Sequence, residues 1–153
     1  MLIASHRTAM KRNKASAPLC RLHSLDLLKG RVLDYGCGHG GDVEYMRLHG
    51  MDVCGYDPYW QPDFPIGSYD TITCTYVLNV VDVEEEKAVI ERTRQLLSPG
   101  GKVFFSVRRD LKGFRNPNVG CVTSRGMQRY VDLSFPVTWE KRGSYCIYSL
   151  PKG

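Results

Sequence analysis

The stretch Val32–Gly41 reads V-L-D-Y-G-C-G-H-G-G. Its short apolar run leads into glycines at alternate positions, a pattern typical of a buried strand that turns sharply into a helix. Amides at the start of such a helix attract negative charge and hydrogen-bond acceptors. Further along, Asp52–Tyr56 has the pattern of a second strand. It ends before Asp57, where a carboxylate can hold both hydroxyls of a ribose. Together these features predict a site for a nucleoside cofactor.

The glycines of this stretch fit two cofactor patterns. Gly36, Gly38 and Gly41 match the dinucleotide spacing G-x-G-x-x-G, and Gly40 in place of Gly41 gives G-x-G-x-G. Asp34 favours the second pattern, because a carboxylate there suits an ammonium group and would repel a pyrophosphate. The remaining chain is also too short for a nicotinamide domain plus a substrate domain.

Two segments, D-Y-G-C-G-H-G and G-Y-D, resemble motifs I and II of class I S-adenosylmethionine (SAM) methyltransferases. A longer set of matches resembles the DNA phosphorothioation-associated methyltransferases; these are His6-Arg7-Thr8-Ala9-Met10, Ser16-x-Pro18, G-Y-D-P, Tyr76-Val77-Leu78-Asn79-Val80 and Val107-Arg108-Arg109-Asp110. The resemblance implies SAM as cofactor. It places the cofactor on Asp34, Tyr35, Gly36, Cys37, Gly38, Gly40, Asp57, Pro58, Tyr59, Thr75 and Tyr76.

Within that set, the resemblance gives Asp34 through Gly40 to the methionine end of SAM and Asp57 to the ribose. Tyr59 or Trp60 is a candidate for stacking on the adenine. The side chains of Tyr35 and Cys37 are expected mainly to pack.

Methyl transfer from a sulfonium needs alignment and exclusion of water more than covalent help. A base for the acceptor proton is expected among His6, Tyr76 and Asp110, and an anionic acceptor is expected to contact Arg7, Arg108 and Arg109. The stretch Thr75–Tyr76 carries neither the N/D-P-P-Y of amino-directed DNA enzymes nor the Pro-Cys of cytosine-C5 enzymes.

The pattern predicts an α/β fold: a Rossmann-like class I methyltransferase sheet that lacks its third strand and has a C-terminal antiparallel hairpin. Residues 1–30 are expected to form an N-terminal cap segment and helix, and residues 31–153 the methyltransferase domain. The first helix is expected to begin at Ser16, to carry Leu19, Leu22, Leu25 and Leu28 on one side, and to end at Gly30.

Further helices are expected near 41–49 and 83–97, and Ser98–Gly101 is expected to form a turn. The segment 58–70 has three prolines and no helical period, so the usual third strand and its helix are expected to be absent. The expected strand order is 52–56, 31–35, 69–75, 102–107, 145–150 and 137–141, with 145–150 antiparallel. Residues 111–126 are expected to form a long loop, followed by a strand over 127–133.

Charge is unevenly distributed along this chain of net charge +5. Residues 1–31 carry seven basic side chains and one acidic side chain. Residues 108–153 carry nine basic side chains and three acidic ones, whereas residues 32–107 are acidic overall. If both basic segments lie at the cofactor mouth, they favour a nucleic-acid or nucleotide acceptor; an ordinary solvated face is the alternative.

Two other functions remain open: methyl transfer to a small metabolite or a protein, and SAM binding without catalysis. Six cysteines without C-x-x-C pairing and the lack of an apolar leader predict a reducing, cytoplasmic location. The spacing of the four histidines predicts no metal site, and no window is long and apolar enough for a membrane span. The sequence does not predict an oligomeric state.

Overall fold

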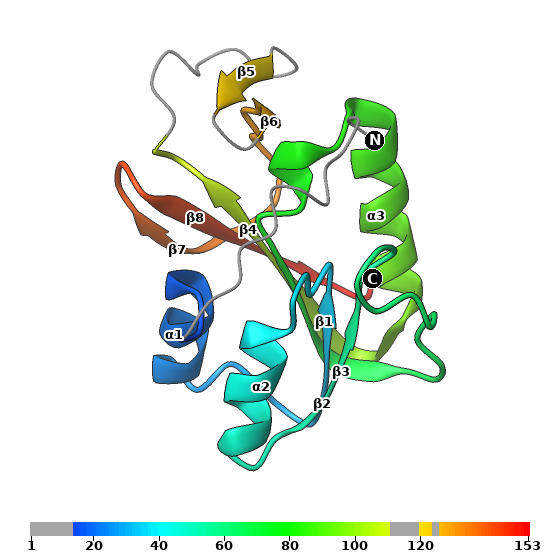
Figure 1. Cartoon of the computed structure of the whole chain (residues 1–153). Coiled ribbons are helices and arrows are strands. Elements are labelled where there is room, and N and C mark those ends of the chain that lie inside the picture. Colours follow the sequence, from blue (N-terminus) through cyan, green and yellow to red (C-terminus); the bar gives the residue numbers. More distant parts are fainter. Residues whose placement is uncertain (1–13, 111–119, 124–125) are drawn as a thin grey trace.

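A computed structural model describes residues 14–110, 120–123 and 126–153. In these residues a six-stranded sheet is covered by helices on both faces (Figure 1). Helices α1 (Ala17–Ser24) and α2 (Gly41–Leu48) lie on one face. The other face carries α3 (Val83–Gln95), preceded by the short 3-10 turn η2 (Leu78–Val80).

The sheet has the strand order β2-β1-β3-β4-β8-β7, which confirms the predicted topology. Four strands are parallel: β1 (Arg31–Tyr35), β2 (Asp52–Tyr56), β3 (Tyr69–Thr75) and β4 (Leu97–Arg108). The last two, β7 (Val137–Lys141) and β8 (Tyr145–Pro151), form a hairpin, and β8 runs antiparallel to β4. Residues 58–68 contain no strand, only an isolated bridge between Asp57 and Gln61, as the prolines predict.

Side chains of β1 alternate between the two helical layers, as the strand period requires. Val32 packs with Leu19 and Met46 beneath α1 and α2, while Leu33 packs with Phe105 in the larger core that includes α3. Because both faces of the central strands are buried, their carboxyl ends are left as the place where polar residues can meet a ligand.

The first helix is shorter than predicted. It ends at Ser24 instead of Gly30, and Asp26 then adopts a left-handed φ of 58°. The chain leaves the helix because the Lys29 amide donates to Thr71 Oγ1 at 3.0 Å, which draws this segment to the start of β3. Leu25, expected on the buried face, is 38 % exposed.

Three other boundaries differ from prediction. Residues 98–101 lie inside β4, where the pairing with β3 shifts register between Tyr69 and Thr71, instead of forming a separate turn. The helix expected to reach residue 97 ends at Gln95. The predicted strand over 127–133 ends at Arg129.

The predicted loop over 111–126 contains part of a two-stranded sheet formed by β5 (Gly120–Thr123) and β6 (Gly126–Arg129). Gly120 pairs with Arg129 and Thr123 with Gly126, so the glycines lie at strand ends and bound the strands without interrupting them. This small hairpin lies beyond the ends of β4 and η2 (Figure 1). Within the described part of the chain, no helix has the length and apolar character to cross a membrane.

Candidate functional site

The glycine-rich turn between β1 and α2 is tightly fixed. Gly36, Gly38 and Gly40 have φ values of 83°, 55° and 85°, a region that side chains with a Cβ rarely adopt. The amides of Gly36 and Cys37 donate to the carbonyl of Tyr56 at 2.6 and 2.9 Å, which fastens the turn to the end of β2. A Cβ on Gly36 would lie 2.3 Å from Val77 Cγ2, but one on Gly40 would meet nothing within 4 Å. The turn therefore leaves open space beside Gly40, the N-cap of α2.

A matched pair of substitutions tests whether that space belongs to a ligand. Gly50, beyond the other end of α2, also has a positive φ, 77°, and a Cβ there would likewise meet nothing within 4 Å. Gly40→Ala and Gly50→Ala should each lower the free energy of unfolding by about 1–2 kcal/mol from backbone strain. Only Gly40→Ala should also weaken binding of a nucleoside cofactor, by about tenfold or more, measured by titration calorimetry. Equal affinities in the two variants would contradict a ligand beside Gly40.

Asp57 joins the two turns that predict the cofactor site. Its Oδ2 accepts from the Gly38 amide at 3.1 Å, and its Oδ1 accepts from the Tyr59 and Trp60 amides at 2.9 and 3.0 Å. Its backbone also bridges to Gln61. The carboxylate thus holds the glycine turn and the loop after β2 in one arrangement. A carboxylate has about four acceptor positions, and three are used here, so one ribose hydroxyl can still bind it.

Asp34 is the buried acid of the site, only 3 % exposed at the carboxyl end of β1. Its Oδ1 accepts from Thr73 Oγ1 at 2.9 Å, and Thr73 is fully buried. A buried carboxylate of this kind binds a cationic group strongly, because water competes little for it.

Two further hydroxyls lie near the carboxyl ends of β3 and β4. Thr75 follows Thr73 by two residues and so shares its face, and it pairs in register with Ser106. Thr75 Oγ1 and Ser106 Oγ are buried and have no hydrogen-bond partner among the described residues. Buried hydroxyls without a partner are costly, so their place near the carboxyl ends of β3 and β4, on the sheet face of Thr73, fits a site that binds a polar ligand.

The cysteines near the site are packing groups. Burial, together with the negative charges of Asp34 and Asp57, raises the pKa of Cys37 to about 12. Burial also raises the pKa of Cys74 and of Cys146. These thiols stay protonated near neutral pH, so none of the three is an activated nucleophile. Among the described residues, no cluster of His, Cys, Asp and Glu could hold a metal ion.

The predicted catalytic residues lie in different surroundings. Tyr76 directly follows β3 with a left-handed φ of 60°, and its amide donates to the Ser106 carbonyl at 2.8 Å. Such strain in a residue other than glycine often marks a functional position. Arg108 clasps Asp110 through two hydrogen bonds of 2.8 and 3.0 Å, which lowers the pKa of Asp110 and makes it a weaker base. His6 lies outside the described residues.

The predicted substrate arginines that the structure describes also bind other groups of the protein. Arg108 is paired with Asp110, and the Arg109 side chain is only 10 % exposed. Arg109 donates to the Val131 carbonyl and to the Tyr148 hydroxyl, both at 2.8 Å. Arg7 lies outside the described residues. The expected contacts of these arginines with an acceptor stay predictions.

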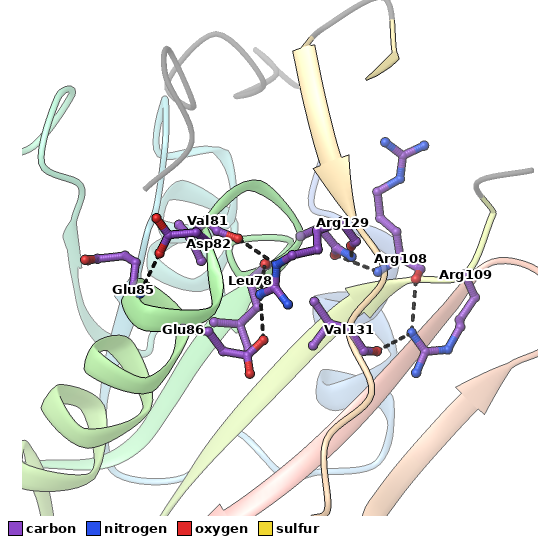
Figure 2. A network of polar contacts seen from close by, with 10 residues as sticks. Leu78, Val81, Asp82, Glu85, Glu86, Arg108, Arg109, Arg129 and Val131 are labelled. Carbon is purple, nitrogen blue, oxygen red and sulfur yellow. Dashed lines mark hydrogen bonds and ion pairs between the residues drawn. The ribbon is translucent and has the colours of Figure 1, made fainter. Parts of the chain in front are cut away.

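A buried arginine network fixes the β5–β6 hairpin above the sheet (Figure 2). Arg129, at the end of β6, donates to the carbonyls of Val81 and Leu78 at 2.8 and 3.1 Å and pairs with Glu86 at 2.6 Å. Asn79 donates to the Arg129 carbonyl and accepts from the Arg108 amide. No sequence pattern indicates this network, because Arg129 is one more basic residue in a basic segment.

Aromatic side chains stand beside Asp57. Tyr59 is 58 % and Trp60 39 % exposed, and Pro58 is exposed as well. The ring of His39, from the glycine turn, lies 4.1 Å from the Trp60 ring, centroid to centroid. These rings provide flat apolar surface for a base, next to the carboxylate that can hold its ribose.

A family model described as a methyltransferase domain matches residues 6–143. Among curated proteins, the ubiquinone biosynthesis O-methyltransferase of Pectobacterium atrosepticum is 30 % identical over 117 residues, 59 % of this chain and 48 % of that protein. The protein of the same name from Xanthomonas oryzae pv. oryzae is 31 % identical over 144 residues, 73 % of this chain and 59 % of its own. The chain thus spans about half the length of the curated relatives it matches.

Solved structures share the fold at low sequence identity. A glycopeptide N-methyltransferase superposes with a TM-score of 0.69 at 12 % identity, covering 91 % of this chain and 97 % of the other. A methyltransferase from Bacteroides fragilis in complex with S-adenosylhomocysteine (SAH) gives 0.62 at 15 % identity, covering 90 % and 78 %.

Proposed function

This chain belongs to the methyltransferase-domain family, and we propose that it transfers the methyl group of SAM to a small-molecule acceptor. The observation that carries the proposal is that Asp57 at the end of β2 binds the glycine turn, while the buried Asp34 lies just before that turn at the carboxyl end of β1. Ligands of open α/β sheets bind at this edge. The SAH complex of the Bacteroides fragilis neighbour supports the same choice of cofactor.

In this proposal each part of SAM meets a different group of the site. The ammonium of the methionine end binds Asp34, the buried acid held by Thr73. The positive end of α2 faces the carboxylate of the same moiety. Asp57 binds a ribose hydroxyl, and Tyr59 or Trp60 stacks on the adenine.

The chemistry asks mainly for alignment. The sulfonium of SAM is a strong methyl donor, so the protein must bring the acceptor atom in line with methyl and sulfur and exclude water. Of the predicted bases, Tyr76 lies at the end of β3 beside Ser106, whereas Asp110 is held by Arg108. We therefore assign Tyr76 to the acceptor side, where its hydroxyl orients the acceptor or passes on its proton.

A small acceptor is supported by the relatives and by the charges. The curated relatives are named for ubiquinone biosynthesis and two structural neighbours for glycopeptide and magnesium protoporphyrin substrates. Three arginines of the basic C-terminal segment, Arg108, Arg109 and Arg129, are each paired with a carboxylate of the protein itself. They offer little to a phosphate backbone, which needs free cationic side chains.

A nucleic-acid or nucleotide acceptor is the second candidate. The net charge of +5 and the motifs shared with the phosphorothioation-associated methyltransferases favour it. Of the basic opening, residues 1–13 lie outside the described residues and Lys14 is exposed.

The test uses SAM with a tritiated methyl group and a cell extract separated into small-molecule, protein and nucleic-acid fractions. We expect the label in the small-molecule fraction. Label confined to nucleic acid, together with binding that weakens steeply with added salt, would establish the second candidate. SAH binding without label in any fraction would indicate a SAM-binding protein without catalysis.

A further inference from the structure

The Asp57 carboxylate brings two rings together across the mouth of the cofactor site. It accepts from the amides of Gly38 and Trp60, so the residue after Gly38, His39, is drawn toward Trp60. The two ring centroids are 4.1 Å apart and the planes are tilted by 41°. This is a close, tilted contact, intermediate between stacked and edge-on, between two side chains that both reach solvent.

Trp60, like Tyr59, is tied to the ribose-binding acid through its amide, and it is the one of the two that also contacts His39. A base attached to a ribose on Asp57 has to lie near Asp57, and stacking needs a free ring face. Tyr59 meets Trp60 edge to face, with centroids 4.7 Å apart and planes at 76°. His39 therefore covers a ring face of the kind that an adenine uses, while Tyr59 supports the indole from another direction.

We propose that His39 competes with the adenine of the cofactor for the ring of Trp60. The inference rests on the proposed function, since it assumes that a SAM-like ligand binds on Asp57. In the free protein the imidazole covers the indole, and it must turn away before the base can stack. Only molecules with an uncovered indole can stack the base, so the apparent affinity falls in proportion to the fraction of uncovered molecules.

The setting of His39 suits such a movement. It stands between Gly38 and Gly40, both with left-handed φ, in a turn whose backbone is fixed from outside by Tyr56 and Asp57. Its exposed side chain can turn without moving that backbone. Exposed side chains change rotamer in picoseconds to nanoseconds, so the competition lowers affinity without slowing binding.

The experiment measures SAH and adenosine binding in the full chain carrying Trp139→Phe, which leaves Trp60 as the one tryptophan. His39→Ala should tighten binding of both ligands by about threefold to tenfold, the range expected for one aromatic contact. Adenosine should gain as much as SAH, because the competition concerns the base. His49→Ala, which removes an imidazole packed on Tyr45 near the far end of α2, is the control and should change neither affinity.

A double substitution locates the effect on Trp60. Trp60→Leu alone should weaken the binding of SAH and adenosine. The double variant His39→Ala/Trp60→Leu should bind both ligands no more tightly than Trp60→Leu does. Weaker or unchanged binding in His39→Ala, or a gain that persists without Trp60, would overturn the proposal. Failure of the unsubstituted chain to bind SAH would overturn the proposed function instead. The His39–Trp60 contact would still be visible as a change of ligand-free Trp60 emission in His39→Ala.

Discussion

Replacing Asp34 with asparagine is expected to weaken SAH binding by about a hundredfold or more, with the fold retained. The carboxylate is 3 % exposed and held by Thr73, so it is already desolvated and aimed when the ammonium group of the ligand arrives. Asparagine keeps the size of the side chain and its hydrogen bond from Thr73, but it carries no charge. Calorimetric titration with SAH measures the loss.

Asp42→Asn is the matched control. Asp42 is also a buried aspartate, but its oxygens accept from the amide and hydroxyl of Ser16, both at 2.7 Å, at the start of α1. Its replacement should lower thermal stability and leave the SAH affinity unchanged. A similar loss of affinity in both variants would mean that Asp34 acts through the fold and not through the ligand.

Arg129→Met is expected to lower the free energy of unfolding by about 3 kcal/mol, because it leaves Glu86 without its partner in a mostly buried position. The same change removes the hydrogen bonds to the carbonyls of Val81 and Leu78. Urea unfolding measures the stability, and hydrogen exchange at 126–131 reports whether the hairpin has come away from the sheet.

Arg142→Met, in the exposed turn between β7 and β8, controls for the loss of a positive charge. It should change stability by less than about 0.5 kcal/mol. If Arg129→Met were as mild, the network in Figure 2 would contribute little to holding the hairpin.

The central fold was predictable because its strands are short apolar runs that start and stop at clear signals. Glycines after β1 and prolines after β2 indicated the turn and the missing third strand. The end of α1 was not predictable, since Leu25 and Leu28 continue the helical period while Thr71, far along the chain, draws the segment away. The β5–β6 hairpin was missed because its glycines resemble those of a loop.

Some features of the candidate site could also be predicted from the sequence, and others could not. Asp34 and Asp57 could be predicted as site residues because Asp34 is the last residue but one of β1 and Asp57 directly follows β2, at the spacing that a nucleoside cofactor requires. The internal pairing of Arg108 with Asp110 and the burial of Arg109 depend on side-chain geometry that spacing does not contain. The contact of His39 with Trp60 depends on Asp57 joining two loops, and no local pattern indicates it.

We propose that Asp34, the glycine turn and Asp57 form a SAM site. Calorimetric titration of the unsubstituted chain with SAH and, separately, with NAD tests it most directly. We expect saturable binding of one SAH per chain and no comparable binding of NAD, because Asp34 attracts an ammonium group and repels a pyrophosphate. Preference for NAD, or no binding of SAH, would contradict the account.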